Sequence, residues 1–538
     1  MTPEAIDAPD SNRASEMLEG SASVFSRRSD VIFAVVIGLT LVAAVWLRWV
    51  GLNAQSLWAD EGFTTWFSQF SPGAQWHVLR WDNSAPLFYV LVHYWVAMWG
   101  SSETAFRALS ALFSTLALGV FYLVARQMWQ SRFFIVLGLM LYSFSFFQIW
   151  YAKEARCYAL FGFLLLSSLY FMLLCLKRPS ALRLGGLVLA LSATLYTHNI
   201  ALYYLPGFVA FWFIYPSEME FRERTRKAMI VGAIVFLFYI PWLPILIDQI
   251  RAVHGYFWAP RPSTTDLFTT LCIFSGLDVN VLKGARYHLP IPFLFGFWSW
   301  VLMLLFVLAL CMTGSWRGVC SADRRKSLAL QAYTFLPIVL MFVWSRVSTS
   351  VYVNRNLIGA CALLPLVLCA PSAVQVENRK RLFQAVACSV LLGAVISLGL
   401  HRENKEDWRG VTEYLVKLPE RQRLVVVLQP FCQILVHYYA TGLFDSGPKP
   451  EITGLVKQFN VPPLGPGILP NLDTADPIGM LSQAVDSHTY KEIDVALQSG
   501  RMPVKVQAIP EFLRSHCSSV QNIDFDRIAV SRCLLTSN

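Results

Sequence analysis

The chain has 538 residues, of which 55% are hydrophobic and only 14% are charged, and its net charge is +10. Because a soluble domain cannot bury so much apolar surface, this composition excludes a soluble protein and indicates a polytopic membrane protein. The basic residues stand in short clusters between apolar runs, as in cytoplasmic loops, so the positive charge is not a signal of nucleic-acid binding.

The N-terminal segment, residues 1–29, is polar and mixed in charge, which predicts a disordered segment without a cleavable signal peptide. Arg27 and Arg28 directly precede the first apolar run, residues 31–50. That run is too long for the apolar region of a signal peptide. It therefore predicts a retained membrane anchor whose N-terminus lies in the cytoplasm.

Apolar runs predict an α-helical membrane domain over residues 30–401 with about 11 to 13 transmembrane helices. The predicted spans are residues 31–50, 106–125, 133–150, 157–176, 184–200, 201–215, 228–247, 291–313, 328–345, 356–372 and 382–400. Basic clusters fall in alternate gaps, which predicts outer-face loops at residues 51–85, 151–156, 248–290 and 346–355. Pro86 to Gly100 is apolar but short, and a full span there would invert the sidedness of the later helices. A re-entrant or interfacial helix is the alternative for this segment.

Residues 402–538 are polar and predict a small soluble α/β domain on the outer face. Asp407 could cap a helix in this domain, and the apolar side chains that share one face of that helix are Trp408, Val411, Tyr414 and Leu415. Residues 423–428 predict a buried strand, with a helix from Pro430 to Tyr439 after it. Residues 504–509 and 527–535 are further strand candidates.

The 11 cysteines follow no metal-ligand spacing, and most lie in apolar runs, where they are expected to be small core residues. Cys517 and Cys533 differ because they lie in the polar C-terminal region. An oxidising outer compartment would allow these two to form a disulfide bond. Two buried thiols are the alternative, and Cys432 is a competing partner.

Two adjacent carboxylates, Asp60 and Glu61, follow the first predicted span among aromatic residues. A carboxylate at a membrane surface can accept a proton from an acceptor hydroxyl or amine, or bind a divalent cation. Neighbouring residues of a helix point about 100° apart, so we expect only one of the two to face a given target. The alternative is that both carboxylates are simply solvated on a loop.

A second polar cluster, Tyr151 to Tyr158, lies in a loop predicted on the same face. Glu154 could supply another carboxylate to the same cavity. Arg156 could hold a phosphate, because a guanidinium fork matches phosphate geometry. In the alternative interpretation Glu154 is a solvated neighbour of Arg156, and Lys153 only extends its ammonium to the interface.

Three more residues are candidates on the outer face. Arg80 and Arg355 could each bind a phosphate, although an interfacial arginine also packs beside tryptophan or meets lipid headgroups. His198 stands near an outer span end, where a lone histidine more often has a structural hydrogen bond than a catalytic role. Since no Ser-His-Asp order, P-loop or dinucleotide motif stands out, we do not expect a nucleotide bound by such a motif.

From Trp58 to about Arg409 the chain resembles the GT-C glycosyltransferases of the group that contains protein O-mannosyltransferases and the lipid A aminoarabinose transferase. The matching stretches are Asp60-Glu61, Asn83 to Tyr89, Arg107 to Ser110, Tyr151 to Tyr158, Tyr196 to Asn199, Arg355 to Leu357 and Asp407 to Arg409. Each stretch is short, but their order along the chain is specific. The chain departs from the family pattern at Ser84, Ala85 and Asn356, where His or Lys, Pro and Tyr are common. The change at Ser84 removes a side chain that could contact phosphate or metal.

The resemblance implies a glycosyltransferase of the cytoplasmic (inner) membrane that acts on its outer face. The donor would be a polyprenyl-phosphate-linked sugar and the acceptor a protein, a lipid or a growing polysaccharide, with inversion at the anomeric carbon. Asp60 would deprotonate or orient the acceptor, and Glu61 and Glu154 are the other candidate catalytic carboxylates. The candidates for binding substrate or its phosphate are Arg80, Arg156, Tyr158, His198 and Arg355. A divalent metal ion is compatible with these residues.

Two other functional classes are alternatives. A transporter or a lipid-linked glycan flippase would line a path across the membrane with polar residues near mid-depth, whereas here the polar residues cluster at span ends. A polysaccharide ligase or polymerase would also transfer glycans, but with another architecture. The early position of Asp60 and Glu61 favours the GT-C interpretation over both.

Overall fold

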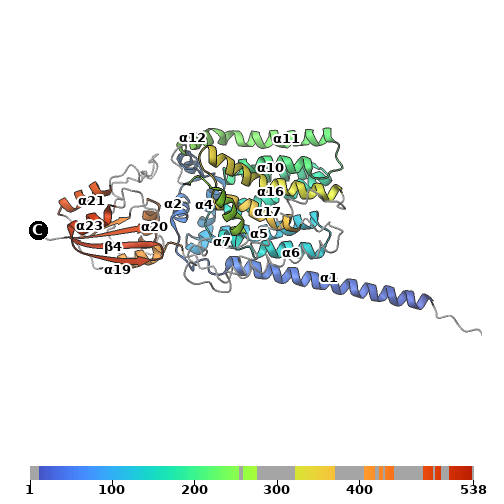
Figure 1. Ribbon diagram of the computed structural model, residues 1–538, viewed down its shortest axis with the longest axis horizontal. Helices are drawn as coiled ribbons and strands as arrows, with labels where there is room; N and C mark the ends of the chain where they lie inside the picture. The colour runs from blue at the N-terminus through green and yellow to red at the C-terminus, as the bar shows by residue number, and fades with distance from the viewer. Residues whose placement is uncertain are drawn as a thin grey trace, which may run out of the picture.

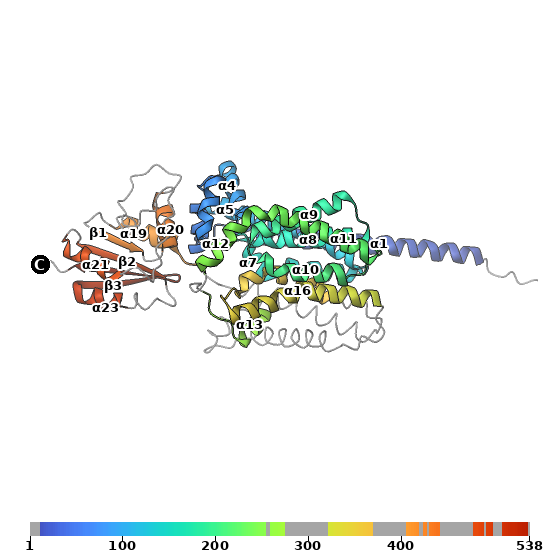
Figure 2. The same cartoon turned by 90° about the horizontal axis from the view of Figure 1, so that it is seen from above.

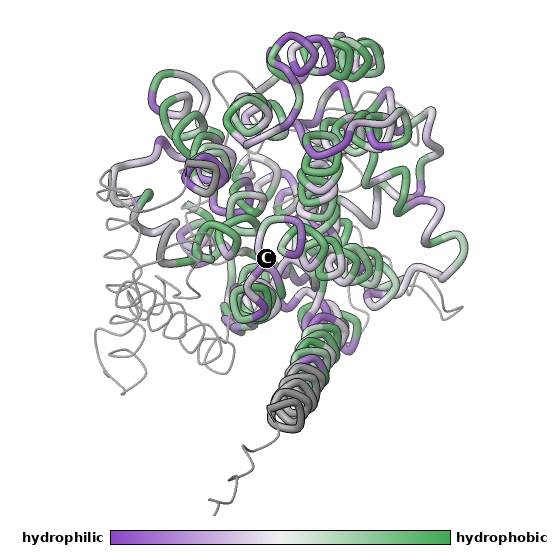
Figure 3. The backbone as a smooth tube through the Cα atoms, turned by 90° about the vertical axis from the view of Figure 1, so that its right-hand side faces the viewer, coloured by the Kyte–Doolittle hydropathy of each residue, from purple (hydrophilic) through white to green (hydrophobic). Residues whose placement is uncertain are grey.

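The structure is a computed structural model, which describes residues 11–253, 259–274, 321–369, 405–418, 423–427, 430–441, 477–488, 491–498 and 508–535. A helical bundle and a smaller domain built on a sheet lie end to end along the longest axis (Figures 1 and 2). Hydrophobic residues are frequent along the helices of the bundle when the molecule is viewed down that axis (Figure 3).

Within the described ranges, five helices are long and apolar enough to cross a membrane, or six if a pair bent by 51° is one span. The five are α1 (Ser11–Trp49), α5 (Glu103–Met128), α8 (Tyr158–Lys177), α11 (Phe221–Tyr239) continued through η2 (Ile240–Trp242) into α12 (Leu243–Val253), and α16 (Ser321–Val347). The bent pair is α6 (Arg132–Ser143) and α7 (Phe146–Ala152). Shorter apolar helices are α9 (Ala181–Thr197), α10 (Ala201–Ile214) and η3–α17 (Asn354–Leu357 and Ile358–Cys369). This arrangement confirms the polytopic helical fold, and the spans predicted at residues 291–313 and 382–400 lie outside the described residues.

The N-terminal helix is longer than expected. α1 begins at Ser11, so the segment predicted to be disordered is helical from that residue onward. Residues 11–29 include Ala, Leu, Met and Glu, which favour a helix once the membrane anchor has nucleated one.

α4 (Leu87–Trp99) is the segment that the sequence did not assign to either a full membrane span or a re-entrant or interfacial helix. Its 13 residues rise about 20 Å, which is less than the hydrocarbon core of about 30 Å, so α4 is too short to span a bilayer. It gathers at one end of the bundle with α2 (Ala59–Phe67), α3 (Pro72–Val78) and η1 (Leu79–Trp81) (Figure 2). The short-helix alternative therefore fits this segment, and α5 is the next long helix after α1.

Local sequence fixes the helix ends and the closest helix contact. The hydroxyls of Ser102 and Ser180 cap α5 and α9 by accepting hydrogen bonds from the backbone N–H groups of Ala105 and Arg183, the third residue of each helix. α10 and α16 pack closely at Gly207, where a Cβ atom would lie 3.2 Å from the backbone of Tyr333. The buried apolar side chains of these helices belong to one continuous core.

The C-terminal domain contains a four-stranded sheet in the order β1-β2-β4-β3. β1 (Arg423–Val427) pairs in parallel with β2 (Glu492–Gln498), and β4 (Ile528–Leu535) pairs antiparallel with both β2 and β3 (Cys517–Phe525). Val425 and Val427 share a core with α19 (Trp408–Lys417) and α20 (Pro430–Thr441). Val426 packs instead with α21 (Pro477–Asp486) and α23 (Ile509–His516). Since successive side chains of a strand point to opposite faces, helices cover both faces of the sheet, and the small α/β domain is confirmed.

The individual predictions for this domain have mixed outcomes. β1, β4 and α20 fall on the predicted segments, and Asp407 caps α19 by accepting a hydrogen bond from the N–H of Gly410 at 3.0 Å. The strand predicted over residues 504–509 is wrong at its end, because α23 begins at Ile509, and residues 504–507 lie outside the described residues. Pro510 suits the first turn of a helix and has no N–H for a sheet. β2 and β3 were not predicted.

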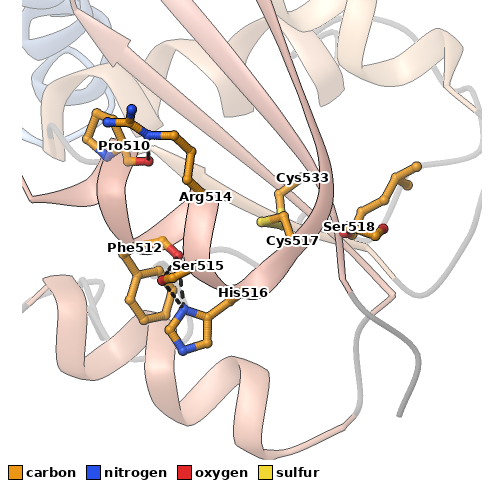
Figure 4. The surroundings of a disulfide bond; sticks show 9 residues. Pro510, Phe512, Arg514, Ser515, His516, Cys517, Ser518 and Cys533 are labelled. Carbon is orange, nitrogen blue, oxygen red and sulfur yellow. Dashed lines mark hydrogen bonds between the residues drawn. A yellow bond between two sulfur atoms is a disulfide. The ribbon is translucent and has the colours of Figure 1, made fainter.

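The predicted disulfide bond between Cys517 and Cys533 is present (Figure 4). It joins the neighbouring strands β3 and β4 with a Cα–Cα distance of 5.5 Å. The competing residue, Cys432, is buried in α20. The bond therefore ties the last strand to the start of β3, directly after α23.

Removing this bond is expected to destabilise the C-terminal domain, because closing a loop of this length contributes about 3 kcal/mol in the chain-entropy model. Replacing both Cys517 and Cys533 with Ser should lower the Tm of the purified protein. A reducing agent should lower the Tm of the wild type to the same value and leave the double variant unchanged. Cys175→Ala, in the core of α8, should keep the response to reductant. Recovery of Cys517 and Cys533 as fully alkylated peptides without reduction would contradict the bond.

Candidate functional site

Segments that are far apart in the sequence meet at the end of the bundle that faces the C-terminal domain (Figure 1). They are α2, the first turns of α5, the turn between α7 and α8, η3, and the residues just before α19. Their charged side chains form what we call the carboxylate–arginine cluster, which consists of Asp60, Glu61, Arg107, Glu154, Arg156, Arg355 and Lys405. The sequence placed most of these residues on one face, and the structure brings them together.

Asp60 lies on α2 between two arginines. Its carboxylate forms an ion pair with the guanidinium of Arg355, and its backbone carbonyl accepts a hydrogen bond from Nη1 of Arg156 at 3.3 Å. The side chain of Asp60 is 27% exposed, so one carboxylate of the cluster can still meet a substrate. The arginines come from the α7–α8 turn and from η3, which fixes the direction of this carboxylate.

Glu61 has the opposite environment, because its side chain is fully buried. Its oxygens accept hydrogen bonds from Nε and Nη2 of Arg107 at 2.8 and 2.6 Å and from the N–H of Ala155 at 2.8 Å. Nζ of Lys405 lies 3.3 Å away. Burial by itself would raise the pKa of Glu61, but the charges of Arg107 and Lys405 outweigh it and lower the pKa to about 2. This geometry favours a structural role for Glu61 over the predicted catalytic one.

Arg107, which the sequence analysis did not single out as a site residue, holds the loop before α2. All five of its N–H donors are used, two on Glu61 and three on the backbone carbonyls of Leu52, Gln55 and Ser56 at 2.7, 2.7 and 2.9 Å. The available signal was a charged residue near the start of an otherwise apolar helix, since such residues are usually paired or functional.

Glu154 is the second carboxylate that can take part in chemistry. Its side chain is 1% exposed, and in the part of the chain that the structure describes its Oε1 atom has no hydrogen-bond partner. Burial, together with the negative charges of Glu61 and Asp60, raises the pKa of Glu154 to about 7 against the opposing charges of Lys405 and Arg355. Glu154 therefore changes its charge near neutral pH, as a proton-transfer group does.

Arg156 and Arg355 are held rigidly beside Asp60. Nη1 of Arg156 donates to the hydroxyl of Tyr89 at 2.9 Å, and that hydroxyl donates to Oγ of Ser84 at 3.1 Å. The Nε atom of Arg156 is buried and has no partner among the described residues. η3, which carries Arg355, is fixed by Tyr204, whose hydroxyl donates to the carbonyl of Asn356 at 3.3 Å. Two guanidinium groups around one carboxylate leave positive charge for an anion.

Tyr158 and His198 are aromatic neighbours of Arg156 and Arg355. The ring of Tyr158 packs edge-on against Tyr151 at 4.8 Å and lies 6.0 Å from the ring of His198. Nδ1 of His198 accepts a hydrogen bond from the N–H of Ile200 at 3.3 Å, which leaves Nε2 to carry the proton of the neutral ring. Burial and the charges of Arg156 and Arg355 lower the pKa of His198 to about 3, so the ring is neutral at physiological pH. It can donate a hydrogen bond but adds no charge.

Arg80 has a different partner. Its Nη1 atom lies 3.3 Å from Oδ2 of Asp248 on α12, and both side chains are well exposed. η1, which carries Arg80, and the segment after it are tied to α12 by Gln249, whose Nε2 donates to the carbonyls of Leu79 and Ser84 at 2.6 and 2.9 Å. Arg80 is therefore paired with Asp248, and its predicted contact with phosphate stays a prediction.

Lys405 completes the cluster from the C-terminal side. Nζ lies 5.5 Å from the ring centroid of Trp150 in addition to its contact with Glu61, and the side chain is 8% exposed. No sequence pattern marks this residue as functional, because it stands in an ordinary polar run. Among the described residues, no group of three or more His, Cys, Asp or Glu side chains is arranged to hold a metal ion.

The C-terminal domain is fastened to the bundle beside this cluster. Nη2 of Arg409 lies 2.5 Å from Oε2 of Glu103 at the start of α5, and the hydroxyl of Tyr439 donates to the same carboxylate. The N–H of Leu57 donates to the hydroxyl of Tyr439 at 2.8 Å, and the N–H of Arg409 donates to Oγ of Ser56 at 3.2 Å. These contacts place the segment from Lys405 to α19 against the loop that leads to Asp60.

Replacing Glu61 with Gln is expected to destabilise the protein by about 3 to 5 kcal/mol, because Arg107 would keep its buried charge without a counter-charge. Thermal unfolding of the purified protein measures this as a lower Tm, and the matched surface variant Glu413→Gln should leave Tm unchanged. Because the pKa of Glu61 is lowered, its contribution to stability is present above pH ~4.5 and is lost as the pH falls towards 2. Equal Tm values for the two variants would contradict the structural role.

Comparison with known proteins places the fold. No protein-family model matches the chain, and no curated protein sequence matches it significantly. Two solved structures of ArnT from Cupriavidus metallidurans match over 92% of this chain and 97% of theirs. The apo structure has a TM-score of 0.53 with 12% sequence identity, and the structure bound to undecaprenyl phosphate has 0.52 with 13%.

The oligosaccharyltransferase of Archaeoglobus fulgidus, tethered to an acceptor peptide, also matches, with a TM-score of 0.44, 12% identity and coverage of 91% of this chain and 73% of that one. The likeness to ArnT extends over the membrane bundle and the C-terminal domain together. The resemblance seen in the short sequence motifs is thus confirmed at the level of architecture: the chain shares the fold of ArnT.

Proposed function

We propose that the protein is a membrane glycosyltransferase that moves a sugar from a polyprenyl-phosphate-linked donor to a protein, lipid or glycan acceptor. The observation that carries this proposal is the carboxylate of Asp60, partly exposed and set between Arg156 and Arg355 at one end of the membrane bundle. The fold shared with ArnT, which has been solved with undecaprenyl phosphate bound, supports the choice of donor.

In this reaction the acceptor's nucleophilic atom attacks the anomeric carbon from the face opposite the phosphate, and the bond between that carbon and the phosphate oxygen breaks. Asp60 takes the proton that the acceptor loses. The electron pair of the broken bond stays on the lipid phosphate, whose added negative charge is stabilised by Arg156 and Arg355. A neutral His198 can donate a hydrogen bond to the same group.

An apolar cavity supports a lipid-linked donor. It has a volume of about 670 Å³ and lies among α9, α10, α11 and α12. Leu195 and Leu202 line it, and these residues flank His198 in the sequence. Isoprenoid units would gain the hydrophobic free energy of burial there while the phosphate remains at the arginines.

The proposed location is the cytoplasmic membrane, with the N-terminus in the cytoplasm and the C-terminal domain on the outer face. The basic loops between the helices support this orientation. A disulfide bond in the C-terminal domain is also typical of an oxidising compartment. To test this location, thiols are blocked in intact cells and the peptides that contain Cys517 and Cys533 are then mapped without reduction. If both cysteines are found fully reduced, the result would argue for a cytoplasmic domain.

Asp60→Asn should abolish the activity, because it keeps the size of the side chain and removes its basicity. Mass spectrometry of cell-envelope glycans and glycolipids, with and without the gene product, first identifies the product. The transfer rate of purified Asp60→Asn protein should then fall by at least about a hundredfold. Asp524→Asn, on an exposed position of β3, is the control and should keep the wild-type rate. A folded Asp60→Asn protein with normal turnover would move the role of base to Glu154.

Arg156→Met should weaken binding of undecaprenyl phosphate to the purified protein by at least about tenfold, since a charge-assisted hydrogen bond contributes about 1.5 to 3 kcal/mol. Arg355→Met should act in the same direction. Arg80→Met should have a smaller effect, because Arg80 is paired with Asp248. Undecaprenol, which lacks the phosphate, serves as the control ligand and should bind all variants alike. Unchanged affinity in both Arg156→Met and Arg355→Met would remove these arginines from the phosphate site.

A further inference from the structure

Lys405 is an unusual member of the carboxylate–arginine cluster because it belongs to the segment that opens the C-terminal domain. It lies 344 positions after Glu61 and reaches Oε2 of that residue at 3.3 Å. Its ammonium lies over the ring of Trp150, at the end of the bent pair α6–α7, and only 8% of its side chain is exposed. Burying a strongly hydrated ammonium group costs free energy, so we expect an interaction in the protein that offsets this cost for Lys405.

Neutralising Glu61 is not a sufficient reason. Glu61 already has a bidentate contact with Arg107 and a hydrogen bond from the N–H of Ala155. The other carboxylate on which the charge of Lys405 acts is Glu154, whose Oε1 atom is buried with no hydrogen-bond partner in the described ranges. Glu154 has no such bidentate partner of its own, and a cation nearby is what allows a buried carboxylate to ionise.

We propose that Lys405 is a positioning residue of the transfer reaction: it holds a positive charge against Glu61, which also binds the N–H of Ala155 next to Glu154, and so favours the ionised form of Glu154. The docked C-terminal domain is thereby a part of the active site and not only an appendage. The groups that act on Glu154 are Asp60 and Glu61 from α2, Arg355 from η3 and Lys405. Three carboxylates and four cations make up the whole cluster.

The placement of Lys405 depends on the attachment of its domain. Asp407 caps α19, and Arg409 in the first turn of that helix is paired with Glu103 of α5. The indole N–H of Trp408 donates to Oε2 of Glu406 at 2.6 Å, which fixes the segment next to Lys405. The pair of Arg409 with Glu103 therefore holds the segment that carries Lys405 against the bundle.

The test is a titration of Glu154 in the purified full-length protein by infrared spectroscopy, in which the carboxyl C=O band reports the protonated form and Glu154→Gln identifies it. The expected midpoint of the wild type is near neutral pH. Lys405→Met should raise this midpoint by at least about one pH unit, because an opposite charge at close range shifts a carboxyl by one to three units. Lys417→Met, the same change at an exposed position of α19, is the control and should leave the midpoint unchanged.

Further variants distinguish an effect of the lost charge from an effect of misfolding. Lys405→Met keeps the length of the side chain, and Glu61 keeps its contacts with Arg107 and Ala155. Lys405→Gln is a second neutral variant, and Lys405→Arg should restore the wild-type midpoint. An identical midpoint in Lys405→Met, Lys405→Gln and Lys417→Met would overturn the inference.

The inference rests on the proposed function in one respect only. If the protein transfers sugar, the acidic limb of its pH–rate profile should shift together with the midpoint of the Glu154 titration. A shifted midpoint in a protein that transfers no sugar would therefore refute the proposed function and leave the charge coupling intact. Active enzyme whose midpoint does not respond to Lys405→Met would refute the coupling alone.

Discussion

The bidentate ion pair between Glu61 and Arg107 is the contact on which the arrangement of the site depends. Both side chains are buried, and in surroundings of low polarity an unpaired charge is far less stable than one with a partner. Because Arg107 also holds three carbonyls of the loop before α2, and Glu61 also holds the N–H of Ala155, this one pair joins α2, α5 and the α7–α8 turn. Any relative movement of these elements would leave one of the charges without its partner.

This constraint separates the two adjacent carboxylates into different tasks. Glu61 points into the protein and is saturated, so the neighbouring Asp60 points about a quarter-turn away, toward Arg355. The break between α6 and α7, where the helices bend by 51°, allows the turn that carries Glu154 and Arg156 to approach α2. η3 carries Arg355 to the site. Tyr204 holds η3 by a hydrogen bond, and Gly359 allows the helix after η3 to pack closely, since a Cβ atom there would lie 2.6 Å from Leu165. The site is thus assembled from helices and the short turns that join them.

The sequence was sufficient for the class of fold and for the common face of the main charged residues. Hydropathy and the basic loops report sidedness directly, and they predict that Asp60, Arg156 and Arg355 lie on the same face. Pattern alone could not show which side chains of an apolar helix face one another, so the role of Arg107 was missed. Lys405 was missed because nothing local distinguishes it from a solvated lysine. β2 was not predicted for a related reason: it buries the polar residues Glu492 and Asp494, and the local sequence does not show that Glu492 is paired with Arg532, at 2.9 Å.

The order of the charged partners along the chain has a consequence for biogenesis. A ribosome makes Glu61 46 residues before Arg107, so the counter-charge for this arginine already exists when α5 is delivered to the bilayer. A guanidinium entering the membrane region without an acidic partner would resist insertion, whereas a helix that arrives beside its waiting carboxylate does not. The N–H of Ala155 follows, and Lys405 comes last, after the helical bundle has been synthesised. Assembly can therefore proceed from the N-terminus without a stage at which the buried arginine lacks its partner.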